Sequence, residues 1–138
     1  MGRKGGGVRF AGYAAVFDRV DNGGDVVRSG AFARSLERRG PIPLLWQHKA
    51  GAVIGTIDQI SEDKRGLRII GRVGGGERGQ RVADMVRDRE IDGLSFGYRV
   101  RRSARRDGVR ELMDLDLIEV SVVSTPMQPL ARVHAVEG

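Results

Sequence analysis

The chain of 138 residues has no cysteine, only 5% aromatic residues and four prolines. The absence of cysteine excludes disulfide bonds, a thiol nucleophile and thiolate metal ligands, and it suits a cytosolic protein. No apolar run approaches the roughly 18 residues of a membrane-spanning helix. The basic N-terminus lacks the apolar segment of a signal peptide.

Ligand-binding motifs are also missing. The glycine-rich stretch 74–79 lacks the Gly-Lys-Ser/Thr ending of a phosphate-binding loop. No potential ligands have the spacing of a metal site. We therefore expect neither a cofactor nor a metal ion.

Acidic residues are fewer than basic ones. The chain has 18 Asp and Glu residues against 24 Lys and Arg residues, and its pI is about 10.7. Such a balance attracts polyanions. The densest basic cluster consists of Arg99, Arg101, Arg102, Arg105 and Arg106. It is either a solvated hairpin tip or a contact surface for an acidic partner or nucleic acid. Because few aromatic residues interleave with these arginines, a stacking platform for single strands is disfavoured.

The length and the 40% hydrophobic content predict one globular domain with a hydrophobic core. We expect a basic tail at residues 1–7, a folded domain at 8–130 and a C-terminal tail at 131–138. The tail assignment rests on Pro126 and Pro129, which are expected to end the ordered chain.

Alternating apolar patterns and turn residues predict about seven short strands and two or three helices. One helix is expected at Ser29–Arg38, capped by Ser29, and one at Glu77–Arg89. Short strands without a strand–helix–strand rhythm predict a mainly β fold, either a closed barrel or a sandwich. The strands are expected at 7–17, 44–48, 51–60, 67–73, 91–102 and 109–124, the last as one long strand or two joined by a bulge.

Histidine is scarce, since the chain has only His48 and His134. His48 follows a predicted strand, and its simplest interpretation is an ordinary histidine at a strand end. A hydroxyl at Ser95 and a carboxylate at Glu119 follow on other strands. A base, a hydroxyl and an orienting carboxylate are the parts of a nucleophilic hydrolase.

Ser95 lies on a strand that alternates Leu94, Phe96 and Tyr98 on one face with Ser95 and Gly97 on the other. The plain interpretation is a serine on a polar face. The functional one is a nucleophile, with Gly97 leaving room for a substrate backbone. Among the other serines, Ser121 is the serious rival.

Glu119 lies within a predicted buried strand, between Ile118 and Val120, where an acid needs a partner. It either orients the histidine or pairs with one of the many arginines. Asp114 and Asp116 face the other side of the strand and are weaker candidates.

These segments resemble the prohead (capsid maturation) serine proteases of tailed bacteriophages and phage-derived particles. The resemblance covers about residues 8 to 133. The order and spacing of the segments, rather than any one of them, make it specific. The segments are Gly12–Asp18, Gly24–Val27, Gly30–Phe32, Pro43–His48, Ile54–Gly55, Asp92–Tyr98, Glu119–Pro126 and Gln128–Pro129.

The resemblance implies a closed antiparallel β-barrel like that of the herpesvirus maturation proteases. It implies catalysis by Ser95 as nucleophile, His48 as base and Glu119 as third member. Because the herpesvirus enzymes use a second histidine as third member, His134 stays an alternative. Arg99 and Arg101 are candidates to stabilise the oxyanion, or are plain surface arginines.

The resemblance also implies a serine endopeptidase that cleaves the major capsid protein or its scaffold segment. The enzyme would act in the host cytoplasm inside the assembling procapsid, with a homodimer expected and no membrane partner. The chain stops just past the catalytic part, which fits a compact member from a reduced phage-like particle such as a gene transfer agent, or a truncated product. The competing hypothesis is a non-catalytic basic β-barrel that binds nucleic acid or capsid protein.

Overall fold

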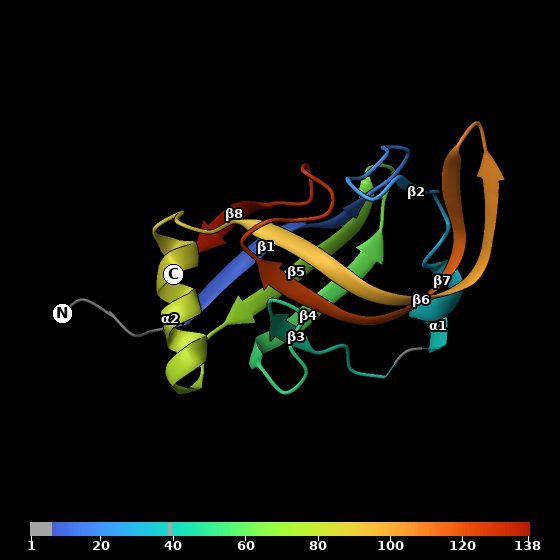
Figure 1. Cartoon of the computed structure of the whole chain (residues 1–138). Helices are drawn as coiled ribbons and strands as arrows, with labels where there is room; N and C mark the ends of the chain where they lie inside the picture. Colours follow the sequence, from blue (N-terminus) through green and yellow to red (C-terminus); the bar gives the residue numbers. More distant parts are fainter. Residues whose placement is uncertain (1–6, 39) are drawn as a thin grey trace.

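A computed structural model describes residues 7–38 and 40–138, which form one eight-stranded sheet and two helices (Figure 1). Residues 1–6 of the predicted basic tail lie outside the described residues. The helices are α1 (Ala33–Arg38) and α2 (Gly76–Arg87). The strands are β1 (Val8–Val16), β2 (Asp25–Val27), β3 (Leu44–Trp46), β4 (Val53–Glu62), β5 (Gly66–Val73), β6 (Gly93–Arg106), β7 (Val109–Val123) and β8 (Val133–Glu137).

The long strand β7 organises the sheet. β6 pairs with β7 along most of its length, and β2 and β3 also pair with β7, at residues 110–112 and 120–122. From β3 the ladders continue through β4, β5 and β1 to β8. The ladders of β2 and β3 with β7 are parallel and the others are antiparallel. The prediction of an antiparallel sheet was therefore wrong for these two pairs. Each pair joins strands that are far apart in the sequence, as parallel pairing requires.

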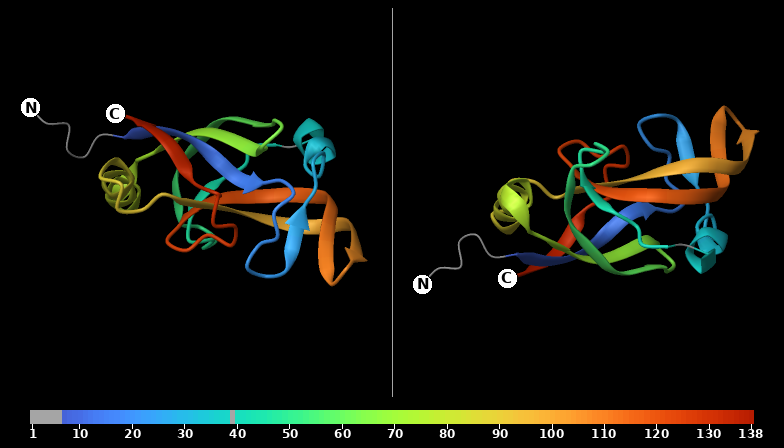
Figure 2. Two further views of the ribbon diagram at one scale, coloured as in Figure 1. Left: turned by 90° about the horizontal axis from the view of Figure 1, so that it is seen from above. Right: turned by 90° about the horizontal axis from the view of Figure 1, so that it is seen from below.

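The ladders form an open path from β6 to β8, so a closed barrel is not confirmed. Its two ends meet at one isolated bridge, between Gly93 and Arg132. Beside this bridge, Leu94 N–H donates to the carbonyl of Ala131 (2.9 Å) and Val133 N–H donates to that of Asp92 (2.8 Å). The view from above shows the β6 and β8 segments converging there (Figure 2).

Two strands of the structure were not predicted from the sequence. The first is β2, which has only three residues, and the second is β8, which pairs with β1. The prediction that Pro126 and Pro129 end the ordered chain was therefore wrong. Both strands are polar or short and become strands through pairing, which a local pattern does not show.

The predicted first helix starts later than expected. Residues Gly30–Phe32 form a turn before α1, and the Glu62 carboxylate of β4 accepts the N–H groups of Gly30 (3.0 Å) and Phe32 (2.7 Å). The expected Ser29 cap is wrong, because a carboxylate distant in sequence satisfies these donors instead.

One face of the sheet forms the core. Leu94 lies opposite Val122 on this face, and both are fully buried. Ser95 lies opposite Ser121, and Gly97 opposite Glu119, so these four residues share the other face. The predicted alternation of β6 is confirmed.

The far end of the β6–β7 hairpin projects beyond the body (Figure 1). Close to its turn, the pairing with β2 and several ion pairs tie it to the rest of the fold. The buried Glu111 receives Arg28 (2.6 Å) and Arg106 (3.2 Å), and Arg110 binds Asp25 (2.8 Å). Leu112 and Leu115 of the same hairpin are buried in the core, so ion pairs and apolar packing together hold it.

Gln128 ties the chain after β7 to β1, and its replacement tests this junction. The buried amide accepts Val16 N–H (2.7 Å) and donates to the Val16 carbonyl (3.0 Å). Gln128→Ala leaves both backbone groups without partners, so we expect the free energy of unfolding to fall by about 2–4 kcal/mol, measured by urea denaturation. The exposed Gln59→Ala is the control and should change it by less than about 0.5 kcal/mol.

Candidate active site

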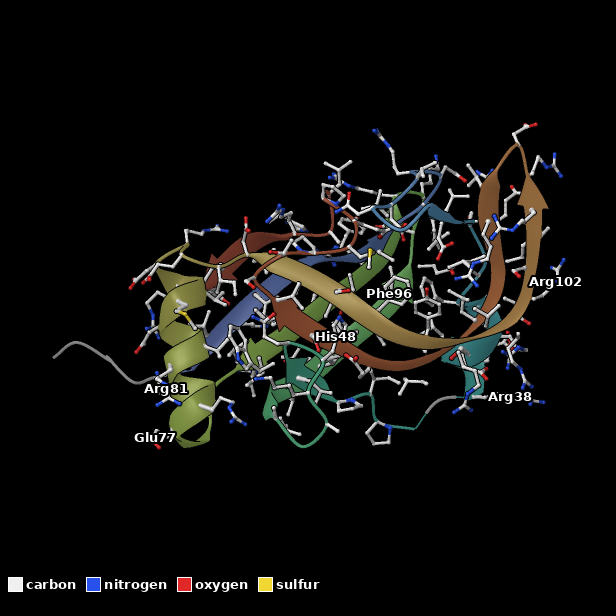
Figure 3. The ribbon with its side chains drawn as sticks, in the orientation of Figure 1. Arg38, His48, Glu77, Arg81, Phe96 and Arg102 are labelled. Atoms are coloured by element: carbon white, nitrogen blue, oxygen red, sulfur yellow. The ribbon has the colours of Figure 1, made fainter. Side chains whose placement is uncertain are left out.

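His48 lies in a tight turn at the end of β3, near the middle of the molecule (Figure 3). Gln47 and His48 both have positive φ, 53° and 59°, which non-glycine residues rarely adopt. Three contacts to the end of β7 hold this turn. Gln47 N–H donates to the carbonyl of Val122 (3.0 Å), the Gln47 amide bonds Ser124, and His48 N–H donates to Ser121 Oγ (3.0 Å).

Glu119 on β7 meets the imidazole directly. Its Oε2 lies 2.6 Å from His48 Nδ1, and its Oε1 accepts the hydroxyl of Ser121 (2.9 Å). An ionised carboxylate only accepts hydrogen bonds, so a neutral ring beside it carries its proton on Nδ1 and leaves Nε2 to accept one. The prediction that Glu119 needs a partner is confirmed, and that partner is His48; within the described residues no arginine pairs with this carboxylate.

Gly97 makes room for this carboxylate. A Cβ built at Gly97 would lie 2.8 Å from Glu119 Cδ and closer still to Oε2. The expectation that Gly97 leaves space for a substrate backbone was therefore wrong, because the Glu119 side chain fills that space. A glycine at this point of β6 is a condition for the position of Glu119.

Ser95 lies on β6, directly opposite Ser121 on β7 and on the same face as Glu119. It is 8% exposed. Within the described residues its hydroxyl makes no hydrogen bond, and no fully buried polar side-chain atom lacks a partner. The Ser95 oxygen is therefore open to solvent at least in part. The structure brings His48 and Glu119 into contact and places Ser95 on the neighbouring strand, without a hydrogen bond to His48.

The rival candidates are buried or bound to other groups. Ser121 is fully buried, so it presents no hydroxyl to a substrate. Arg34 binds both Asp114 and Asp116, and its hydrogen bond lowers the pKa of Asp116 below the ordinary value. The ring of His134, on β8, lies against Tyr13 with centroids 5.8 Å apart.

Neither predicted oxyanion helper touches the site in the described part of the chain. Arg101 lies 3.5 Å from Asp116, and Arg99 is exposed on β6 opposite the same aspartate. Figure 3 shows Arg102, further along the hairpin, at the end of the molecule away from His48. The oxyanion role of Arg99 or Arg101 stays a prediction.

A groove of about 540 Å³ adjoins the histidine and the glutamate. Apolar side chains dominate its lining, and two of them are unusually exposed, Val53 at 55% and Ile118 at 46%. Its lining residues are Pro43, Leu45, His48, Ala50, Gly51, Val53, Ile118 and Glu119. Exposed aliphatic side chains beside a polar pair are typical of a ligand-binding surface.

The described residues contain no group of three or more His, Asp or Glu side chains arranged to hold a metal ion. Neither helix in this part of the chain is long and apolar enough to cross a membrane.

The fold is that of virus-encoded proteases. The structure superposes on varicella-zoster virus protease with a TM-score of 0.62 and 15% identity, covering 96% of this chain and 64% of that one. It superposes on the bacteriophage T4 capsid assembly protease with a TM-score of 0.67 and 15% identity, covering 86% of this chain and 82% of that one. At these identities the likeness shows the fold alone.

Sequence defines the family. Residues 3–138 match the model of the caudovirus prohead serine protease family, and the chain belongs to that family. It is 31% identical over 96 residues to the prohead protease of Enterobacteria phage HK97, which covers 66% of this chain and 42% of that protein. The chain thus spans less than half the length of this relative. The resemblance seen in the sequence is confirmed.

The role of Gly97 is testable by spectroscopy. Gly97→Ala should displace the Glu119 carboxylate from His48, because the added methyl occupies its place. In a His134→Gln background, ¹⁵N NMR of the single remaining imidazole should show loss of the pure Nδ1–H tautomer. Gly40→Ala, with open space around the new methyl, is the control. An unchanged His48 signal in Gly97→Ala would contradict the close packing of Gly97 against Glu119.

Proposed function

We propose that this chain is the catalytic domain of a serine endopeptidase that cleaves capsid or scaffold protein during procapsid maturation. The observation that carries the proposal is the 2.6 Å contact between His48 Nδ1 and Glu119, on the sheet face that also presents Ser95. A buried carboxylate that fixes the tautomer of a half-exposed histidine is the arrangement that general-base catalysis requires.

In the proposed mechanism, His48 Nε2 removes the proton of Ser95 as its oxygen attacks the scissile carbonyl. The tetrahedral intermediate collapses when His48 returns this proton to the leaving amine, which leaves an acyl-enzyme on Ser95. A water molecule, deprotonated by His48, then hydrolyses the ester. Glu119 holds the imidazole and stabilises the imidazolium in both halves of the reaction.

The substrate assignment rests on family membership and on the groove. Val53 and Ile118 offer apolar contact to side chains of an extended peptide next to His48. The T4 relative is a capsid assembly protease, and the HK97 relative is a prohead protease. We extend that role to this chain, with action inside the assembling procapsid and a homodimer as its expected state.

A fluorophosphonate probe tests the chemistry without a known substrate, because it phosphonylates only an activated serine. The KSHV protease, which shares the fold at a TM-score of 0.65 and 12% identity, was solved with a hexapeptide phosphonate inhibitor. Peptide mapping by mass spectrometry should place the label on Ser95. Ser95→Ala should lose it, and His48→Ala should slow labelling by about a thousandfold or more. Glu119→Gln should be slowed less, because the orienting acid usually contributes less than the base.

The control is Ser103→Ala, which removes an exposed hydroxyl from the same strand. It should label at the parent rate. If Ser95→Ala labels normally, or if the label maps to another serine, the assignment of the nucleophile fails. If the parent chain does not label at all while remaining folded, the protease proposal fails.

A second function is favoured by one observation, the exposed arginines of the β6–β7 hairpin. Within the described residues Arg99, Arg102 and Arg105 make no ion pair, although their neighbours Arg101, Arg106 and Arg110 do. These exposed guanidinium groups lie on β6, which pairs only with β7 along this end of the sheet, and they can neutralise the phosphates of DNA.

Duplex DNA binding distinguishes this second function from catalysis. If the hairpin binds DNA, replacing Arg99, Arg102 and Arg105 by Gln should weaken binding at low salt and reduce the salt dependence by up to about three charges. Replacing the exposed Arg19, Arg78 and Arg89 by Gln gives the same change in net charge and is the control. Equal losses in both triple variants would show that only the net charge matters.

A further inference from the structure

Ser121 has no assigned role, yet it is the most completely buried polar residue at the candidate site. It is 0% exposed and lies between Ser95 on β6 and Leu45 on β3 in the strand register. A buried hydroxyl is costly unless it is hydrogen-bonded, so its partners show what it contributes.

Its two hydrogen-bond partners are Glu119 and His48, the residues whose contact defines the candidate site. The Ser121 hydroxyl donates to Glu119 Oε1 (2.9 Å), and its oxygen accepts the backbone N–H of His48 (3.0 Å). Glu119 Oε2 in turn bonds the His48 ring (2.6 Å). The hydrogen bonds form a closed circuit in which Ser121 holds the carboxylate from one side and the histidine backbone from the other.

The circuit opposes two unfavourable tendencies. The His48 backbone at φ 59° persists only where surrounding contacts determine it, and the bond to Ser121 is one of them. Glu119 is also nearly buried, and the hydroxyl satisfies the carboxylate oxygen that His48 does not reach. Without Ser121 the carboxylate would be free to rotate, and the His48 turn would lose one of its contacts to β7.

We propose that Ser121 is a positioning residue, which fixes the Nδ1–H tautomer and the orientation of His48 by bonding Glu119 and the His48 backbone at once. This inference rests on the proposed function, and it also assigns a task to the serine that the sequence presented as a rival nucleophile. Ser121 does not touch the substrate, so its loss should slow the chemical step and leave binding unchanged.

The first test separates these two quantities with the fluorophosphonate probe. Ser121→Ala should lower the limiting rate of phosphonylation of Ser95 by about tenfold to a hundredfold, the range seen when a residue that orients a metal-binding histidine is replaced. The half-saturating concentration should stay within about twofold. Ser121→Thr keeps the hydroxyl and should recover most of the rate.

A matched control comes from Ser35, which is also buried and whose hydroxyl also accepts an N–H of β7, that of Leu117 (2.9 Å). Ser35→Ala should cost similar thermal stability without slowing phosphonylation. If Ser35→Ala slows it as much as Ser121→Ala does, Ser121 acts only through stability and the proposal is overturned.

The second test does not depend on catalysis. In the His134→Gln background, ¹⁵N NMR of His48 should show the Nδ1–H tautomer in the parent and in Ser35→Ala, and a mixture of tautomers in Ser121→Ala. If Ser121→Thr does not fold, the comparison of the parent, Ser35→Ala and Ser121→Ala still tests the positioning role. A pure Nδ1–H signal and a normal phosphonylation rate in Ser121→Ala would overturn the positioning role while leaving the Ser95 assignment intact. Loss of the Ser95 assignment would instead be shown by Ser95→Ala.

Discussion

The carboxylate of Glu119 is the group on which the geometry of the candidate site depends. It is 8% exposed and uses both oxygens, one for the His48 ring and one for the Ser121 hydroxyl. Burial makes these bonds strong, and it also makes an unpaired carboxylate costly. The positive-φ turn at His48 and the glycine at position 97 are therefore best understood as local adjustments that let one buried acid keep its partners.

Strand pairing places these partners, although they come from distant parts of the chain. β7 contributes Glu119 and Ser121, β6 contributes Ser95 and Gly97, and the turn after β3 contributes His48. β7 lies between β6 and β3, so both its neighbours present their residues to the same short stretch. A central strand is a rigid support, which suits a site whose distances must be held closely.

The hairpin formed by the distal parts of β6 and β7 is physically different from this site. Most of its β6 side chains are exposed, whereas its β7 strand is secured by the buried Leu112 and Leu115 and by the buried Glu111, which Arg28 and Arg106 bind. Exposed arginine pairs contribute little to stability, whereas a buried acid between two arginines is costly to disturb. The same pair of strands thus carries a rigid, buried site at one end and an open, basic surface at the other.

The sequence by itself determined the mainly β class, the alternation of β6 and the three candidate residues, because period-two patterns and short motifs are local. The rest depended on pairing between distant segments: the parallel ladders of β7, the strand β8, the carboxylate of Glu62 at the turn before α1, and the contact of His48 with Glu119. Ser121 shows the difference most clearly. Its place in the sequence fits a nucleophile. Only the tertiary structure shows that it is completely buried between two neighbouring strands and that its hydroxyl is hydrogen-bonded to Glu119 and to the His48 backbone.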